Sequence, residues 1–173
     1  MDHKLSVFTY LASNHPLEEI ENPHVRQLSI HQALELGVKV PDFLLEPDLD
    51  REKPDVILFV DDEKNFSELS IHTFQRKDIY DDIYTEKKYF AYLEWEYTRN
   101  RAEHLIQYIH RHLMEADEIE LSQIWLGSGF DEPLPKMKTY PILLNELTCL
   151  DLERVFKNKP FEYPERIIVS RPK

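Results

Sequence analysis

The strongest constraint on the fold is a change of hydrophobic period after residue 88. Apolar side chains first alternate with Glu94 and Glu96, as in a strand with one exposed face. The alternating set is Tyr89, Ala91, Leu93, Trp95 and Tyr97. A stripe at helical spacing follows, made of Ala102, Leu105, Ile106, Ile109, Leu113 and Ala116. The pattern therefore predicts a strand and then an amphipathic helix, with Asn100 as the helix cap and Glu103 as its N3 partner.

Three more strands are expected after this helix. Residues 119–126 are mostly apolar, residues 137–144 look extended, and residues 166–170 form a short apolar run. Pro141 has no N–H to give to a ladder, so the strand over residues 137–144 is expected at an edge or in an interrupted ladder.

A second helix is predicted between the last two of these strands. Thr148 and Asp151 have the spacing of a capping box, and the helix should run to about residue 158, before Pro160. Residues 88–171 then read β-α-β-β-α-β, which is the split βαβ order of a ferredoxin-like unit. The expected class is α+β.

The N-terminal part of the chain is predicted to be rich in strands. Strands are expected in residues 4–12, 56–60 and 69–73. A short helix over residues 28–36 should end at Gly37, and Asp61 and Asp62 should form the tight turn of a hairpin.

These N-terminal strands are expected to pack on the ferredoxin-like sheet, to extend it, or to form a second, smaller sheet beside it. Residues 1–173 are therefore read as a single α+β unit. A subdivision into residues 1–76 and 88–171 remains the alternative.

Charge restricts the partners that the protein can have. The sequence holds 21 Lys and Arg against 33 Asp and Glu, for a formal charge of −12. Residues 1–62 alone hold thirteen acids and five bases, a net charge of −8. No nucleic-acid binding is expected, because that needs clustered cations to displace phosphate counterions. A basic protein partner is favoured, since the negative field would steer it toward the surface.

Other functional classes are disfavoured by what the sequence lacks. Its three glycines cannot build either of the common glycine-rich nucleotide loops, and no cofactor is expected. No apolar run is long enough to span a bilayer, so no membrane association is expected. Cys149 is the only cysteine, which rules out an internal disulfide, and a reducing cytoplasm is the expected location.

The histidines form no recognisable ligand pattern. His104, His110 and His112 share the first predicted helix, but their spacings differ from the i, i+4 pair that lets two imidazoles converge on zinc. No metal site and no catalytic residue are therefore assigned from the sequence.

One candidate partner-binding segment follows the third N-terminal strand. It interleaves acids with tyrosines, which give buried contact area at low entropic cost. Its residues are Asp78, Tyr80, Asp81, Asp82, Tyr84 and Glu86. The leading hypothesis is a small acidic cytoplasmic interaction or regulatory protein that binds a more basic macromolecule without catalysis.

Two alternatives remain. The first is an enzyme or small-ligand binder with a pocket between the N-terminal segment and the βαββαβ unit. Its polar groups would be His72, Glu94, Glu96 and His104. The second is a homodimer formed through an exposed sheet face or edge.

Overall fold

A computed structural model describes residues 6–74, 85–126, 136–157 and 163–172. The chain forms two compact units. The first joins Met1–Glu21 to Leu69–Lys173, and the second is Asn22–Glu68. These bounds differ from the subdivision expected from the sequence, and whether the chain behaves as one folding unit stays a prediction.

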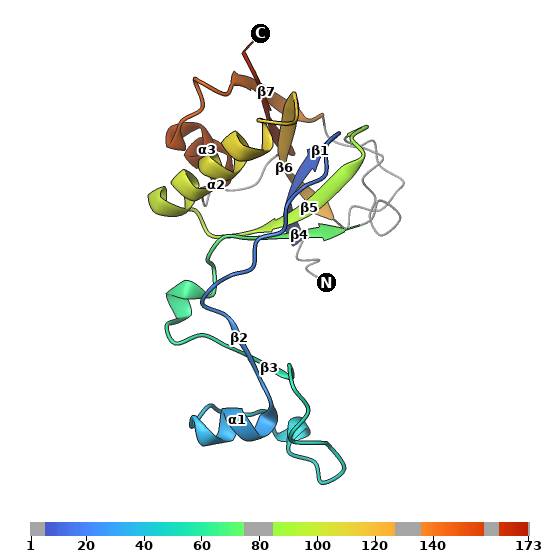
Figure 1. Cartoon of the computed structure of the whole chain (residues 1–173), viewed down its shortest axis with the longest axis vertical. Coiled ribbons are helices and arrows are strands. Elements are labelled where there is room, and N and C mark those ends of the chain that lie inside the picture. Colours follow the sequence, from blue (N-terminus) through green and yellow to red (C-terminus); the bar gives the residue numbers. More distant parts are fainter. Residues whose placement is uncertain (1–5, 75–84, 127–135, 158–162, 173) are drawn as a thin grey trace. The chain divides into compact units, whose positions relative to one another are not determined.

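The first unit is built on a six-stranded sheet of order β4-β5-β1-β6-β8-β7 (Figure 1). Neighbouring strands run antiparallel except β7 and β8, which are parallel. The strands are β1 (Ser6–Ser13), β4 (Ser70–Phe74), β5 (Tyr89–Glu94), β6 (Glu118–Leu126), β7 (Lys138–Leu143) and β8 (Glu165–Ser170). The class is therefore α+β with a large, mostly antiparallel sheet, as the sequence predicts.

The N-terminal strand β1 lies inside this sheet. It pairs antiparallel with both β5 and β6, so β5 and β6 run in the same direction. The helix α2 (Arg99–His112) connects them, and β1 fills the gap that this crossover leaves. The helix α3 (Cys149–Phe156) connects the parallel strands β7 and β8.

The ferredoxin-like arrangement is not confirmed. The four strands expected after residue 88 do not form one contiguous platform, because β1 separates β5 from β6. Of the N-terminal strands, β1 inserts into the six-stranded sheet and β4 extends it beyond β5. The strands β2 and β3 form a second, smaller sheet, which was one of the expected arrangements. Hydrophobic period identifies a strand but not its partner, so the pattern gave the elements and not their order.

Apolar side chains are buried on both faces of the sheet. The face toward α2 and α3 holds the main core, in which Leu11, Leu121 and Ile167 are fully buried. The opposite face holds a smaller cluster around Tyr10, Phe90 and Ile124. The inner strands β1, β5 and β6 each contribute buried residues to both clusters and so join the two layers. None of the described helices is long and apolar enough to cross a membrane.

The N-terminal caps of α2 and α3 can be compared with those predicted from the sequence. At α3, Thr148 and Asp151 form the predicted capping box. At α2 the cap is Thr98, whose hydroxyl accepts a hydrogen bond from the backbone N–H of Arg101, so the prediction of Asn100 was wrong. Both caps provide hydrogen bonds for backbone groups that the first helical turn leaves unpaired.

The segment after β5 leaves the sheet earlier than the sequence suggests. Trp95 and Tyr97 continue the alternating pattern, yet β5 ends at Glu94. The ring of Trp95 packs edge-on against Phe156 of α3, with centroids 5.8 Å apart. The Tyr97 hydroxyl donates to the Cys149 carbonyl at 3.2 Å. These contacts direct the chain toward the helix layer.

Both outer strands of the sheet carry features of edge strands. On β4, Ile71 exchanges two backbone hydrogen bonds with Ile20, and Glu19 accepts from the Thr73 N–H at 3.0 Å. The hydrogen bond from the Thr73 hydroxyl, together with that from its N–H, lowers the pKa of the Glu19 carboxyl. At the other side β7 contains Pro141 and pairs only with β8, as its sequence predicts.

The second unit has its own small core. The strands β2 (Arg26–Leu28) and β3 (Ile57–Phe59) pair antiparallel, and α1 (Ile30–Glu35) follows β2 with a complete Ser29–Gln32 capping box. Gly37, which has a φ of 70°, follows this helix as predicted. Two short 3₁₀ helices complete the unit, η1 (Asp42–Leu44) and η2 (Glu63–Asn65). The core residues are Leu28, Ile30, Ala33 and Val40.

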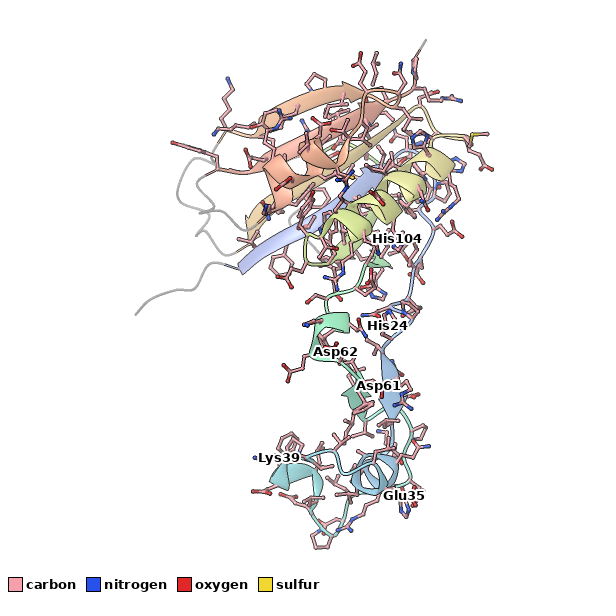
Figure 2. All side chains as sticks on the ribbon, turned by 90° about the vertical axis from the view of Figure 1, so that its left-hand side faces the viewer. His24, Glu35, Lys39, Asp61, Asp62 and His104 are labelled. Atoms are coloured by element: carbon pink, nitrogen blue, oxygen red, sulfur yellow. The ribbon has the colours of Figure 1, made fainter. Side chains whose placement is uncertain are left out.

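The expected hairpin turn at Asp61 and Asp62 is not formed. The strand β3 pairs with β2, and β4 belongs to the other sheet. Asp62 instead caps η2 by accepting a hydrogen bond from the Lys64 N–H at 3.0 Å (Figure 2). The polar run after β3 contains η2, and the strand that follows it belongs to the other sheet.

Two leucines on α3 give a matched test of the main core. Leu152 is fully buried and Leu150 is 73% exposed. We expect Leu152→Ala to lower the free energy of unfolding by about 2–5 kcal/mol, because it removes apolar contacts and leaves a cavity. Leu150→Ala should change it by less than about 0.5 kcal/mol. Urea unfolding of both variants measures the difference, and equal losses would contradict this packing.

Candidate functional site

Most of the acidic and tyrosine-bearing segment proposed from the sequence lies outside the described residues. Asp78, Tyr80, Asp81, Asp82 and Tyr84 belong to residues 75–84. Glu86 is described and its side chain is exposed. The role of this segment in partner binding stays a prediction.

The four groups proposed for a pocket occupy different elements. His72 lies on β4 with its Nδ1 4.0 Å from the Glu21 carboxylate, and His104 lies exposed on α2 (Figure 2). Glu94 ends β5, and Glu96 follows in the connection to α2. No described contact joins any two of the four. Glu94 does line a cavity, which is considered further below.

The second unit is unusually acidic for its size. Its 47 residues hold eleven acids and five bases, for a net charge of −6. It also holds six of the twelve large apolar side chains that are exposed among the described residues. These six are Leu34, Leu36, Phe43, Leu49, Leu58 and Phe66. A small surface thus combines negative charge with accessible apolar area.

Both properties occur together in residues 42–49. Phe43 is 66% exposed and Leu49 is 42% exposed. Between and beside them lie the exposed acids Asp42, Glu46 and Asp48. Across the described parts of the chain, no Lys, Arg or His side chain lies within ion-pair distance of these three carboxylates. We call residues 42–49 the acidic-apolar segment.

Two bases of the same unit do not pair with these three carboxylates, although Arg51 contacts the backbone of the segment. The Arg26 guanidinium pairs with Asp61 at 2.9 Å and lies over the Phe59 ring, 4.9 Å from its centroid. Arg51 donates to the Leu45 carbonyl at 3.3 Å. Within the described residues, the carboxylates of Asp42, Glu46 and Asp48 are therefore exposed and form no ion pair. The sequence showed the acids, but not that Phe43 and Leu49 would be left outside the small core.

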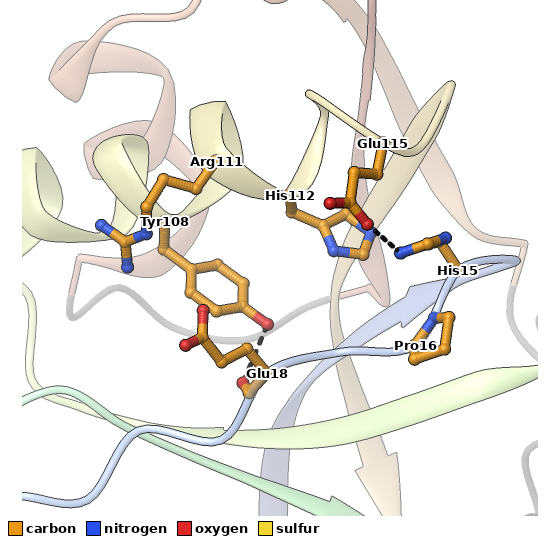
Figure 3. Close-up of a pocket in the computed structure, with 7 residues that line it drawn as sticks. All are labelled: His15, Pro16, Glu18, Tyr108, Arg111, His112 and Glu115. Carbon is orange, nitrogen blue, oxygen red and sulfur yellow. Dashed lines mark hydrogen bonds and ion pairs between the residues drawn. The ribbon is translucent and has the colours of Figure 1, made fainter.

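A second candidate site is a cavity in the first unit that the sequence did not suggest (Figure 3). It has a volume of about 260 Å³ and lies between the end of β1 and the end of α2. Its lining residues are His15, Pro16, Glu18, Tyr108, Arg111, His112 and Glu115. The residues come from segments about a hundred positions apart, so no local motif pointed to it.

Two histidines meet in this cavity. His15 pairs through Nε2 with Glu115 at 2.9 Å, and its ring lies edge-on to that of His112 with centroids 5.7 Å apart. The His112 Nε2 lies 2.8 Å from the Ser13 hydroxyl. Burial lowers the pKa of His112, and the neighbouring His15 lowers it further, while Glu115 acts in the opposite direction. His112 is therefore neutral near pH 7.

Tyr108 closes the wall of the cavity beside His112. The two rings are stacked, with centroids 6.4 Å apart, and the Tyr108 hydroxyl donates to the Glu18 carbonyl at 3.1 Å. Burial raises the pKa of Tyr108 to about 12, so the hydroxyl keeps its proton at neutral pH. The hydrogen bond ties the loop after β1 to the helix.

The Ser13 hydroxyl and the His112 imidazole have the spacing of a nucleophile and its base, but the hydroxyl is not accessible to a substrate. Ser13 is fully buried. Its hydroxyl also accepts from the His15 N–H at 3.1 Å and lies 3.3 Å from the Glu118 carbonyl. A substrate cannot reach this oxygen, so Ser13 positions the imidazole. Within the described residues, no group of three ligating side chains could hold a metal ion.

No family model matches the chain, and no curated protein or solved structure matches it.

The lowered pKa of His112 predicts a loss of stability in acid. In the unfolded chain the pKa of His112 is near 6.5, which is above its pKa in the folded protein. As the pH falls, the unfolded state therefore binds a proton at His112 before the folded state does. We expect the unfolding midpoint in urea to fall progressively below about pH 6.5. In His112→Gln this part of the pH dependence should disappear.

His110→Gln is the control, because His110 is exposed on the same helix. Its pH profile should follow that of the unchanged protein. A His112→Gln profile that kept the full acid loss would show that other groups cause it.

Proposed function

We propose that this protein is an interaction protein that binds a basic partner through the acidic-apolar segment of its second unit. The single observation that carries the proposal is the arrangement of Asp42, Glu46 and Asp48 around two exposed apolar side chains, Phe43 and Leu49. The partner would be a protein segment in which Lys or Arg residues stand beside apolar ones. The segment around Asp78–Glu86 remains a further candidate contact.

The charges of the acidic-apolar segment support recognition of a cation. Exposed carboxylates without a paired cation create a local negative potential, which steers a basic partner and raises its association rate. The chain carries −12 overall, so this local field adds to the field of the whole molecule. The same charges disfavour a nucleic acid, whose phosphates they would repel.

The apolar side chains support a protein partner rather than free cations. Aromatic residues at the centre of an interface often contribute most of its binding energy, because they are fully desolvated on association. Phe43 is the most exposed large aromatic side chain in the second unit. Burying Phe43 and Leu49 would give the contact the apolar centre that charges alone do not supply.

A second copy of this chain fits the segment less well. Two such surfaces facing each other would bring like charges together, at a cost in free energy. Homodimerisation through an exposed face or edge of the sheet stays an alternative. The cytoplasm remains the proposed location, because Cys149 is the only cysteine and unpaired thiols persist in reducing compartments.

Binding of fluorescent peptides by the full-length protein tests the proposal. Three peptides of equal length are compared, made of Lys with Leu, Lys with Ser, and Glu with Leu. We expect the Lys–Leu peptide to bind most tightly and the Glu–Leu peptide to bind least. Phe43→Ser should weaken binding of the Lys–Leu peptide about tenfold while the salt dependence persists. Glu46→Gln/Asp48→Asn should weaken it about tenfold at low salt and flatten the salt dependence.

A charge-matched control separates the segment from the net charge. Glu103→Gln/Glu146→Gln removes two exposed acids from the first unit. This variant should bind the Lys–Leu peptide within about twofold of the unchanged protein, because distant exposed charges are screened by salt. An equal loss in the control, or equal binding of the Glu–Leu peptide, would refute recognition by the acidic-apolar segment.

A further inference from the structure

The six-stranded sheet opens between two of its inner strands. Along β1 and β5 the paired residues run from Ser13 opposite Tyr89 to Tyr10 opposite Tyr92, and there the pairing stops. Beyond this point β1 pairs only with β6, and β5 pairs only with β4. The two halves of the sheet therefore separate at one end.

Packing of the chain after β5 explains the separation. Trp95 and Tyr97 are held by Phe156 and by the Cys149 carbonyl of α3, as described above. The buried Arg101 also donates to the Glu96 carbonyl at 3.2 Å, which fixes the same connection from α2. The end of β5 thus follows the helix layer, while β1 continues along β6.

The space left by this separation is a cavity of about 390 Å³, within the size range of small-ligand sites. Its lining consists of consecutive residues on the two separated strands. They are Val7, Phe8 and Thr9 of β1, Tyr92, Leu93 and Glu94 of β5, and Trp95 just beyond it. Strand backbone at such an opening has lost its ladder partner and requires another, either solvent or a ligand.

The side chains around the opening combine aromatic rings with one carboxylate. The ring centroids of Phe8 and Tyr92 lie 6.2 Å apart, and those of Phe74 and Tyr92 lie 4.4 Å apart. Neighbouring rings therefore hold the aromatic wall in place. Glu94 is exposed. Among the described residues, no cation lies within ion-pair distance of Glu94. Thr9 adds a hydroxyl.

This lining matches a planar cation. Aromatic faces attract cations, and a guanidinium in addition stacks on a ring while donating two parallel hydrogen bonds to a carboxylate. A guanidinium carries five donors and no acceptor, so the Glu94 carboxylate, the Thr9 hydroxyl and strand carbonyls can all serve it. An anion would meet Glu94 and the −12 charge of the chain.

We propose that the opening between β1 and β5 binds a guanidinium group, with Glu94 as its counterion and Phe8 and Tyr92 as its aromatic wall. The group would belong either to a free compound of amino-acid size or to an arginine side chain of a polypeptide. This site lies in the first unit and does not depend on the acidic-apolar segment.

Calorimetric titration of the full-length protein with agmatine tests the proposal, and tryptophan fluorescence is followed in parallel because Trp95 lines the opening. We expect saturable binding with a dissociation constant below about 1 mM. Glu94→Gln keeps the shape of the side chain but removes its charge, and should weaken binding at least about tenfold. Putrescine has the same charge as agmatine without the planar group, and should bind more weakly.

Two controls keep the result interpretable. Glu146→Gln removes an exposed acid that does not line the opening, and should bind agmatine as the unchanged protein does. Thermal unfolding of Glu94→Gln verifies that the variant is folded, and Phe8→Leu provides a second variant of the aromatic wall. A peptide with one internal arginine identifies the source: tighter binding than agmatine indicates a polypeptide side chain, and weaker binding indicates a free compound.

Three results would overturn the proposal. These are no saturable binding of either agmatine or the arginine peptide, equal binding by Glu94→Gln, and binding of putrescine as tight as that of agmatine. None of them bears on the peptide binding expected of the acidic-apolar segment, because Glu94 lies outside it.

Discussion

Burial of β1 on both faces is the constraint on which the first unit depends. Leu11 enters the core beneath the helices, while Tyr10 and Ala12 enter the cluster on the opposite face. The strand pairs with β6 along its whole length and with β5 over Tyr10–Ser13. Without β1, the crossover from β5 through α2 to β6 would enclose an empty strand position.

The histidine cavity and the opening beside Glu94 are both consequences of where β1 ends its contacts. At one end Ser13 holds the His112 ring, and the chain then turns through His15 to form the wall of the histidine cavity. At the other end β1 continues along β6 after β5 has turned toward α3, which leaves the opening beside Glu94. A single strand thereby positions polar groups at both ends of the sheet.

Local elements were predictable from the sequence, and their partners were not. Pro141 indicated an edge strand, and Thr148 with Asp151 indicated a helix start, because each signal depends on backbone chemistry within a few residues. The central place of β1 depends on pairing with residues about a hundred positions away, which hydrophobic period does not encode. For the same reason His72 and His104 were grouped without meeting, whereas Ser13 and His112 meet without any motif. The exposure of Phe43 likewise depends on how few residues the small core of the second unit can cover.

The segment that leaves β1 has one more effect on the sheet. Ile20 occupies hydrogen-bonding positions along the outer side of β4, and the Glu19 carboxylate accepts a hydrogen bond from the Thr73 N–H there. An uncovered outer strand is a template on which other chains can polymerise. Here the protein blocks part of that template with its own backbone and a charged side chain. Growth into fibrils from this side is thus opposed by the native topology, without recourse to a chaperone or a second subunit.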